Sequence, residues 1–422
     1  MELCNRNILI LGLAKYDSEI ESTIVTLAKH LARKNNVFYI ETPYTWKDLL
    51  LNKHGKEKAR RDKIYLSHNN HLIDTGTPNL KVMVMPTVMS INWVPEGKIY
   101  RALLKLNESF MRRRIQKVLE AEKIQQYVFI NSFNFYYPDL GNMLSPEVTA
   151  YHCVDPLVYP AELKHGLISE RKLVENSNVI ICTSKRLYDE KKQQNQNTFF
   201  VPNAADIAHS SKALQSSLQV HSVLAGIKKP VVGYFGNIER RLDYELIDAV
   251  TAANPDTSFV FAGPVIKEHV PDWFFARSNI HLTGAVPYSE MPQVLKGFDT
   301  AIIPFKKDAV SATIFPLKLF EYLGAGKPVV ATDFNPDLKD FTNDTVAYCS
   351  GAAQFSEAIK NAIDNDSAAQ MEARLKIAAQ NTWEKRGNEF STLINKYMPG
   401  GAANDASEAG ELQNEGQIIV NI

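Results

Sequence analysis

The sequence predicts an α/β protein made of two doubly wound domains, each a parallel sheet covered by helices on both faces. Three observations support this prediction. Short apolar runs alternate with amphipathic segments, the alternation starts again after a polar stretch near residue 205, and the first strand of each half ends on a glycine, Gly12 and Gly236. Strands separated by helices of about ten residues imply right-handed βαβ units and hence parallel sheets.

The first half opens with a buried strand at residues 7–12, an unbroken apolar run that ends at Gly12. Residues 20–34 follow as a helix, because Ile24, Leu27, Ala28 and Leu31 recur at helical spacing. The further elements expected in this half are strands 37–40, 82–85, 128–130, 148–151 and 179–182 and helices 99–120 and 163–176.

The second half repeats this order. It opens with a strand at residues 230–236, which again closes on a glycine, and a helix at residues 244–253 follows. The remaining expected elements are strands 258–263, 280–282, 300–304 and 328–331 and helices 290–296, 317–323 and 383–397.

The polar stretch at residues 201–219 is the expected hinge between the domains. The predicted boundaries are an N-terminal domain at 1–205, a C-terminal domain at 206–378, a helix at 379–398 that returns to the N-terminal domain, and a tail at 399–422. The tail has four acids and no Lys or Arg, which predicts disorder. Ligands of such sheets bind outside the carboxyl ends of the strands, so we expect the site in a cleft where the two domains face each other.

Composition narrows the function classes. The chain has 47 basic and 47 acidic residues, whereas a dedicated nucleic-acid binder more often carries a basic excess. Four cysteines without a Cys-x-x-Cys pair argue against a disulfide framework and a structural zinc site, and fit a reducing cytosol. The longest apolar runs are far shorter than the ~20 residues of a membrane span, and no secretory signal is recognisable. We therefore expect a cytoplasmic protein.

The first candidate binding segment is residues 233–241, where a strand ends, a short loop follows and a helix is expected to begin. Gly236 lets a diphosphate approach the backbone, and the amides of the loop around Asn237 would point at it. Arg240 or Arg241 could add a charge-assisted contact to phosphate oxygens. The alternative is a structural turn with solvated arginines. The segment lacks the third glycine of the dinucleotide fingerprint.

The second candidate segment is residues 315–330. Pro316 suits the first turn of a helix, and Lys318 and Glu321 lie three residues apart on one face near its N-terminus. A lysine there can neutralise phosphate, and the carboxylate can accept hydrogen bonds from a ribose diol. The alternative is an ordinary Glu–Lys helix pair. A phosphate-binding loop of the nucleotide triphosphatases is excluded, because Lys327 is followed by proline.

Two polar side chains follow the strand at residues 148–151. His152 has a side chain whose usual pKa suits general-base work, and Asp155 could do the same work if it is partly desolvated. The alternative for His152 is a structural histidine. The Asp-x-Asp at residues 364–366 is expected to be a solvated helix boundary, so we predict no metal site there.

Two basic clusters lie in the N-terminal half. Cations beside apolar residues suit anionic lipid headgroups or a lipid-diphosphate acceptor, and the alternative is the solvated face of a core helix. The first cluster is Lys53, Lys56, Lys58, Arg60, Arg61 and Lys63. The second, on the expected helix from residue 98, is Lys98, Arg101, Lys105, Arg112, Arg113, Arg114 and Lys117, interleaved with Leu103, Leu106, Phe110 and Ile115.

Taken together, the two candidate binding segments resemble the nucleotide-sugar glycosyltransferases of the two-Rossmann-domain (GT-B) fold, in particular the "glycosyl transferases group 1" set. Bacterial members that build surface polysaccharides of the teichuronic-acid kind are the most similar. The resemblance covers about residues 5–398 and is strongest across 229–333. Supporting segments occur in the family's order at residues 151–155, 179–185, 201–206, 279–288 and 383–386.

The resemblance implies roles for individual positions. By position, Lys318 with Arg241 or Arg240 would contact the donor diphosphate, Glu321 would hold the ribose hydroxyls, and backbone groups of Val286 and Pro287 would read the base edge. Two positions depart from the family. Thr313 stands where the first acid of its Glu-x7-Glu pattern belongs, and Asn237 replaces its arginine, so retention or inversion at the anomeric carbon is left open.

The implied function is that of a glycosyltransferase that moves a sugar from a nucleotide-diphosphate donor, UDP- or GDP-linked, to a glycan or lipid-linked acceptor in surface-polysaccharide biosynthesis. Fixed cations and a helix N-terminus can neutralise the leaving group, so neither a metal nor a separate cofactor is expected. We also expect contact with the anionic inner face of the cell membrane and none with nucleic acid. Two alternatives are a nucleotide-sugar epimerase of the same fold and a catalytically inactive, glycosyltransferase-like binding protein.

Overall fold

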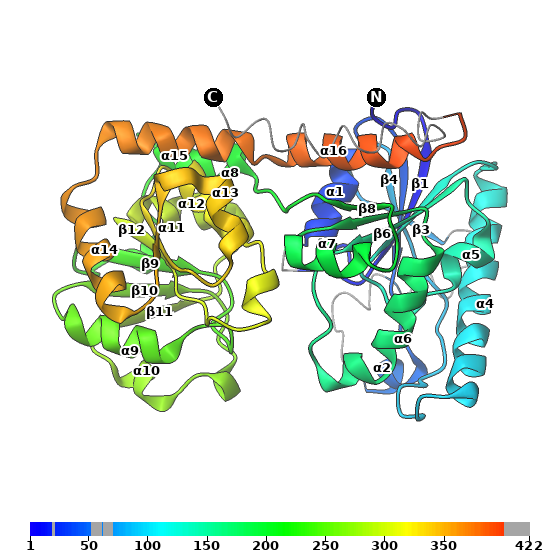
Figure 1. Ribbon diagram of the computed structural model, residues 1–422, viewed down its shortest axis with the longest axis horizontal. Coiled ribbons are helices and arrows are strands. Elements are labelled where there is room, and N and C mark those ends of the chain that lie inside the picture. Colours follow the sequence, from blue (N-terminus) through cyan, green and yellow to red (C-terminus); the bar gives the residue numbers. More distant parts are fainter. Residues whose placement is uncertain (19–21, 52–60, 62–70, 401–422) are drawn as a thin grey trace. The chain divides into compact units, whose positions relative to one another are not determined.

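The computed structural model describes residues 1–18, 22–51, 61 and 71–400 of the chain. Its contacts divide the chain into two compact units, each with its own sheet (Figure 1). Unit 1 comprises residues 1–202 together with the chain from Gly387 onward, and unit 2 comprises residues 203–386. The predicted class, two doubly wound α/β domains, is confirmed. The predicted tail at 399–422 lies almost wholly outside the described residues.

Unit 1 contains a sheet in the order β3-β4-β2-β1-β5-β6-β7-β8. All neighbouring strands run parallel except β3 and β4, which pair antiparallel at one edge. The strands are β1 (Asn7–Gly12), β2 (Asn36–Glu41), β3 (Leu72–Asp74), β4 (Leu80–Met83), β5 (Val128–Ser132), β6 (Val148–Cys153), β7 (Val179–Cys182) and β8 (Thr198–Phe200).

The first strand shows why its apolar run is unbroken. Side chains alternate between the two faces of a sheet, and both faces of this one are covered. Ile8 and Ile10 join the core cluster that includes residues of α1 and α16, whereas Leu9 and Leu11 join the cluster that includes residues of α4. Every residue of β1 after Asn7 is buried for this reason.

Helices cover the sheet of unit 1 on both faces (Figure 1). The longest is α4, whose buried side shows the helical spacing of Leu104, Met111, Ile115 and Val118. None of the described helices has both the length and the apolar character that a membrane crossing requires. The helices of this unit are α1 (Thr23–Leu31), α2 (Trp46–Leu50), α4 (Lys98–Ala121), α5 (Leu140–Leu144), α6 (Pro160–Asn176) and α7 (Lys185–Lys192).

Unit 2 contains an all-parallel sheet in the order β11-β10-β9-β12-β13-β14. The strands are β9 (Val231–Phe235), β10 (Ser258–Ala262), β11 (Ile280–Gly284), β12 (Thr300–Ile303), β13 (Val329–Thr332) and β14 (Val346–Cys349). The helices are α8 (Ile207–Ser210), α9 (Tyr244–Ala253), α10 (Asp272–Ala276), α11 (Met291–Gly297), α12 (Leu317–Gly324), α13 (Lys339–Thr342), α14 (Ala352–Asp364) and α15 (Ala368–Gln380). The order of strands reverses between β9 and β12, so the carboxyl end of β9 is a topological switch point.

Several element boundaries differ from the prediction. The strand expected at residues 82–85 is β4 at Leu80–Met83, and β3, β8 and β14 were not predicted. Both β3 and β8 are edge strands of three residues, too short to show a period of two. The helix expected at residues 20–34 is α1, Thr23–Leu31, and the side chain of Asn35 donates to the carbonyl of Leu31 at its end, at 3.0 Å.

The last helix, α16 (Trp383–Lys396), belongs to both units, since the boundary falls at Gly387. Its later residues Phe390 and Ile394 are buried in the core of unit 1. Gly387 lies against α1, where the ring of His30 hydrogen-bonds to Asn388 at 3.0 Å. A Cβ at Gly387 would lie 2.6 Å from Cγ of His30, so the helix approaches α1 this closely only because this position has no side chain.

We expect Gly387→Ala to destabilise unit 1 by about 1–3 kcal/mol, because the added methyl collides with the His30 ring in a packed contact. Urea unfolding followed by circular dichroism would measure the change. Gly351→Ala is the matched control, because nothing lies within 4 Å of a Cβ at that position. Equal stability of the two variants would contradict the close approach.

Candidate functional site

The loops after β9 and β10 in unit 2 are joined to each other through their backbones. The amide of Gly236 donates to the carbonyl of Ala262 at 2.9 Å, and the amide of Ile238 donates to the carbonyl of Pro264 at 2.9 Å. Gly236 and Gly263 have φ angles of +125° and +152°, which favour glycine. A Cβ at Gly263 would lie 2.8 Å from the carbonyl carbon of Gly236, so only glycine lets the two loops approach this closely.

Lys318 extends from the first turn of α12 toward this loop. Its Nζ donates to the hydroxyl of Tyr234 at 2.8 Å and lies 4.0 Å from the centre of that ring. A Cβ at Gly236 would lie 3.3 Å from Cε of Lys318, so the lysine occupies the space beside the glycine. The Tyr234 hydroxyl in turn donates to the carbonyl of Asn237 at 3.0 Å. One tyrosine therefore connects the lysine of α12 to the loop after β9.

The environment of Lys318 lowers its pKa from 10.5 to about 7. Burial of the ammonium group is the largest cause, and the charge of Arg241 is the next; Glu321 and Glu239 act in the opposite direction. An ammonium group whose charge is costly to hold because of burial and a neighbouring cation gains most from an anion that reaches it. Lys318 is thus suited to contact a negatively charged group.

Arg241 is the arginine whose charge acts on Lys318. Its guanidinium pairs with the carboxylate of Glu239 and lies 5.9 Å from the centre of the Phe305 ring, while the amide of Lys306 donates to its carbonyl at 2.9 Å. The sequence left open whether Arg240 or Arg241 serves the loop. The structure brings Arg241 into the group around Lys318.

Glu321, one turn after Lys318, is 6% exposed. The hydroxyl of Tyr288 donates to its Oε1 at 2.6 Å. Tyr288 is itself fixed, because the ring of His209 stacks on it at 4.7 Å between centres and His209 Nε2 lies 2.8 Å from its carbonyl oxygen. The carboxylate orientation of Glu321 is therefore set by a tyrosine from the loop after β11.

The other predicted binding residues lie in the same unit. Val286 and Pro287 come directly before Tyr288 in the loop that follows β11, with Val286 partly buried and Pro287 exposed. Thr313 is 2% exposed, and its hydroxyl donates to the carbonyl of Val310 at 2.6 Å. Thr313 therefore completes a local turn before α12, and the roles predicted for these three residues stay predictions.

The two predicted general bases belong to unit 1, at the carboxyl end of β6. His152 is 3% exposed, its Nδ1 lies 3.1 Å from the hydroxyl of Ser132, and burial lowers its pKa to about 3. Its ring also contacts the edge of Phe390 of α16. Asp155 is exposed. At neutral pH the His152 imidazole is uncharged and a weak base, and of the two side chains Asp155 is the one accessible to solvent.

The first basic cluster lies outside the described residues except for Arg61. This residue is 1% exposed, and its guanidinium donates to Glu41 Oε2 at 2.6 Å and to Asp17 Oδ1 at 2.6 Å. The expectation that Arg61 faces an anionic ligand is wrong, because two buried or half-buried carboxylates already neutralise it. Charge counting along the sequence could not distinguish this residue from its neighbours.

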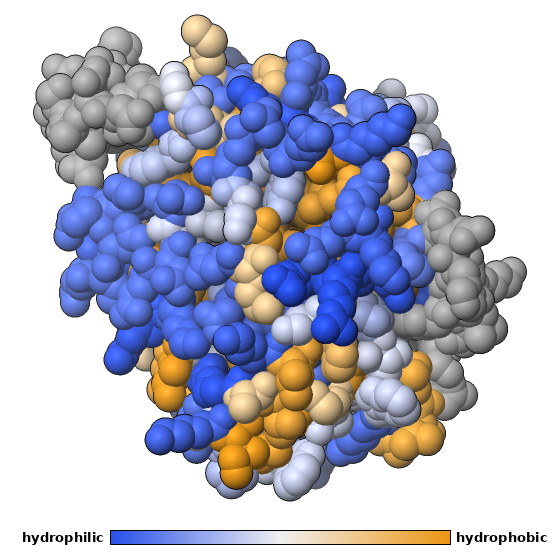
Figure 2. Space-filling view, turned by 90° about the vertical axis from the view of Figure 1, so that its right-hand side faces the viewer, coloured by the Kyte–Doolittle hydropathy of each residue, from blue (hydrophilic) through white to orange (hydrophobic). Residues whose placement is uncertain are grey.

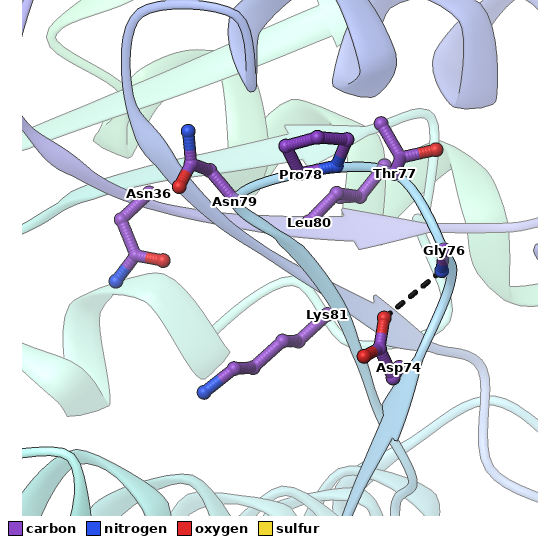
Figure 3. Close-up of a pocket in the computed structure, with 8 residues that line it drawn as sticks. All are labelled: Asn36, Asp74, Gly76, Thr77, Pro78, Asn79, Leu80 and Lys81. Atoms are coloured by element: carbon purple, nitrogen blue, oxygen red, sulfur yellow. Dashed lines mark hydrogen bonds between the residues drawn. The ribbon is translucent and has the colours of Figure 1, made fainter.

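A pocket of about 450 Å³ lies in unit 1 at the turn between β3 and β4 (Figure 3). Within it, Asp74 Oδ1 accepts a hydrogen bond from the amide of Gly76 at 2.9 Å, and Lys81 pairs with Glu122 at 2.8 Å. Asp74 therefore serves the turn itself and Lys81 pairs with the residue that follows α4, and none of the residues predicted to bind a ligand lines the pocket.

Within the described residues, no group of three His, Cys, Asp or Glu side chains is placed to hold a metal ion. In the Asp-x-Asp segment, Asp366 forms a two-point pair with Arg374, with distances of 2.9 and 2.8 Å. Arg374 also donates to the carbonyl of Gly326 at 2.8 Å, which ties α15 to the end of α12.

Two tyrosines of this site were missed by reasoning from the sequence. Tyr234 orders Lys318, and Tyr288 orders Glu321. Tyr234 lies inside an apolar strand, where the sequence predicts that an aromatic residue belongs to the hydrophobic core. Tyr288 is the last residue of the segment 279–288 and follows Pro287 directly, and that position was the one available signal.

Comparison with known proteins identifies this part of the chain. Residues 229–365, which contain Tyr234, Tyr288, Lys318 and Glu321, match the family described as glycosyl transferases group 1. This part of unit 2 is therefore similar to glycosyl transferases group 1. The resemblance expected from the sequence is confirmed.

A curated relative from Bacillus subtilis (strain 168), described as "Putative teichuronic acid biosynthesis glycosyltransferase TuaH", is 28% identical over 213 residues. This alignment covers 47% of the chain and 53% of the relative, so the chain spans about half the length of the curated relative it matches.

Solved structures confirm the GT-B fold. Sucrose-phosphate synthase from Thermosynechococcus elongatus matches with a TM-score of 0.63 at 14% identity, over 92% of this chain and 98% of that chain. Anabaena HepE in complex with UDP and glucose matches with a TM-score of 0.59 at 14% identity, with the same coverage. The E. coli structure titled "Trehalose-6-phosphate" and bound with UDP-2-fluoro glucose matches with a TM-score of 0.65 at 8% identity, over 92% and 99%.

The matched part of unit 2 thus gathers a cation of lowered pKa, a glycine loop at a sheet switch point and a fixed carboxylate. The amides of Gly236 and Ile238, which the sequence predicted to point at a diphosphate, donate instead to the carbonyls of Ala262 and Pro264. A lysine with a nearby arginine can neutralise a diphosphate, and a carboxylate one helical turn away can accept two hydrogen bonds from a diol. These are the groups that recognition of a nucleoside diphosphate requires.

Proposed function

We propose that this protein is a glycosyltransferase that moves a hexosyl or related sugar from a nucleotide-diphosphate donor, UDP- or GDP-linked, to an acceptor. The observation that carries the proposal is Lys318, held beside Gly236 and one helical turn from Glu321. In this proposal Lys318, with Arg241, neutralises the diphosphate as it leaves, and Glu321 holds the ribose. Fixed charges of this kind stabilise the leaving group without reorganisation during the reaction.

The acceptor we propose is a glycan or lipid-linked glycan of a surface polysaccharide, reached at the inner face of the cell membrane. The description of the curated relative names teichuronic acid biosynthesis. The exposed basic surface of α4 supports a site beside anionic lipid. For the acceptor hydroxyl, Asp155 is the proposed general base, because it is exposed whereas the pKa of His152 is about 3.

The test of the donor site is a thermal-shift experiment with UDP and GDP. A ligand selective for the folded state raises the melting temperature, and we expect one of the two to do so. Glu321→Gln should weaken nucleotide binding about tenfold or more, because the neutral amide loses the charge-assisted bonds to the ribose. Glu357→Gln, on the exposed face of α14, is the matched control. An unchanged shift for Glu321→Gln would refute the ribose assignment.

The alternatives give different results in the same preparation. Slow hydrolysis of a nucleotide sugar supports the transferase, and interconversion of sugar epimers supports the epimerase. Nucleotide binding without turnover on any donor–acceptor pair supports an inactive binding protein. Thr313 and Asn237, which replace an acid and an arginine of the family pattern, are the positions that distinguish this chain.

A further inference from the structure

The outer face of α4 is both apolar and cationic. Ile99, Leu106 and Phe110 are 72%, 50% and 41% exposed, and their spacing of seven and four residues places them in one stripe along the helix. Lys105 and Arg113 are exposed beside this stripe. We define the α4 outer face as Lys98, Ile99, Lys105, Leu106, Phe110, Arg113 and Lys117.

Between residues 98 and 119 of α4, which the structure describes in full, the one acid is Glu108. It is 0% exposed, and its Oε1 accepts a hydrogen bond from the amide of Asp139 at 2.8 Å. The last turn of α4 carries one exposed acid, Glu120, three residues after Lys117. Arg101 is neutralised by Glu96 at 2.7 Å and is not part of the face. The exposed cations of α4 therefore form a local positive surface on a chain whose formal net charge is zero.

Further exposed apolar side chains lie near α4, on the neighbouring helix α6 and just before Lys98. α6 packs beside α4 through Arg101, which donates to Ser169 at 2.8 Å, and through Lys164, which donates to the carbonyl of Asn92 at 2.8 Å. On α6, Leu167 is 58% exposed, and Trp93, just before α4, is 78% exposed. Figure 2, which looks onto the molecule from the α4 side, shows hydrophobic side chains gathered toward the lower edge beneath a strongly hydrophilic band.

We propose that the α4 outer face docks on an anionic lipid bilayer. The apolar stripe enters the headgroup region while the lysines and arginines bind lipid phosphates. The mixed pattern favours lipid over a protein partner, because the centres of protein interfaces are depleted of lysine, whereas here Lys105 and Lys117 lie among the apolar residues. The inference extends the proposed function by naming the surface that would bring the enzyme to a lipid-linked acceptor.

The test is co-sedimentation of the full chain with vesicles of phosphatidylcholine alone or mixed with phosphatidylglycerol. We expect binding to the mixed vesicles only, weakened by salt. Lys105→Gln, Arg113→Gln and Lys117→Gln together should weaken it about 100-fold. Leu106→Ser with Phe110→Ser should weaken it about tenfold, although these substitutions leave the charge unchanged.

The matched control removes three exposed cations elsewhere, with Lys267→Gln, Lys360→Gln and Lys385→Gln. If the control loses as much binding as the α4 variant, the effect is one of net charge and the proposal is overturned. No binding to mixed vesicles also overturns it. So does a dimer in sedimentation velocity that the Leu106→Ser, Phe110→Ser variant dissociates, since a second copy would then cover the face.

Nucleotide thermal shifts separate this proposal from the donor assignment. The α4 variants change unit 1, whereas Lys318 and Glu321 lie in unit 2, so the nucleotide shift should be unchanged in every α4 variant. Vesicle binding without any nucleotide shift would leave the lipid surface standing and refute the donor site. A nucleotide shift without vesicle binding would support the donor site and overturn the lipid surface.

Discussion

Replacing Lys318 with methionine is expected to weaken nucleotide binding about 100-fold while raising the melting temperature of the unliganded protein by about 2–4 °C. The lysine is half-buried among Tyr234, Phe235 and Phe305, and its pKa is lowered to about 7. Holding its charge in these surroundings is therefore unfavourable. Methionine keeps the apolar stem and removes this cost, but it offers nothing to a diphosphate.

The pH dependence follows from the same pKa. The unfolded chain, with a lysine pKa near 10.5, binds more protons than the folded chain between about pH 7 and 10.5, so the free energy of unfolding rises with pH in that window. The gain from Lys318→Met should thus be largest at pH 7 and below. A bound diphosphate raises the lysine pKa, so wild-type binding at pH 8 should take up a proton and weaken as pH rises.

Calorimetry in two buffers of different ionisation enthalpy measures this proton uptake, and a thermal melt measures the stability. Lys360→Met, on the exposed face of α14, is the matched control and should change neither quantity. Wild-type affinity in Lys318→Met would refute the role of this lysine in the donor site.

Gly263→Ala is expected to weaken nucleotide binding at least tenfold and to destabilise unit 2 by about 1–3 kcal/mol. The new Cβ would collide with the carbonyl group of Gly236, and a backbone atom cannot rotate away as a side chain can. The loop after β9 must therefore shift away from the loop after β10. The loop and the neighbouring Lys318 would then no longer be positioned to contact the same diphosphate.

Gly226→Ala is the control for this variant. Gly226 also has a positive φ, +77°, but nothing lies within 4 Å of a Cβ there. It should therefore lose only the stability that left-handed backbone strain costs, about 1 kcal/mol, and bind nucleotide as wild type does. Equal nucleotide affinity in the two variants, measured by titration calorimetry, would contradict the contact between the two loops.

The fold was predictable because buried parallel strands leave a strong pattern. The runs at residues 7–12 and 230–236 are apolar on both faces, and each ends on a glycine at the carboxyl end of its strand. Edge strands such as β3 carry three residues and no clear period. Their pairing depends on the neighbouring strand, and the sequence alone does not show it.

The candidate site was predictable in part for a different reason. Lys318 and Glu321 lie one turn apart on one helix, so their proximity follows from local spacing. Tyr288 reaches Glu321 across 33 positions of sequence, and that contact depends on tertiary folding. The burial of Arg61 is likewise tertiary, since its partner Glu41 lies 20 residues earlier at the end of β2.

The course of α16 has a practical consequence for anyone who wishes to produce the N-terminal half alone. A fragment that stops at residue 202 lacks Phe390 and Ile394, whose side chains fill the space beside β1 and α1. Such a fragment would expose a strip of interior to water and invite aggregation. A circular permutant that splices residues 387–400 ahead of Met1 keeps the strip covered, and Asn395 already donates to the carbonyl of Met1 at 3.1 Å.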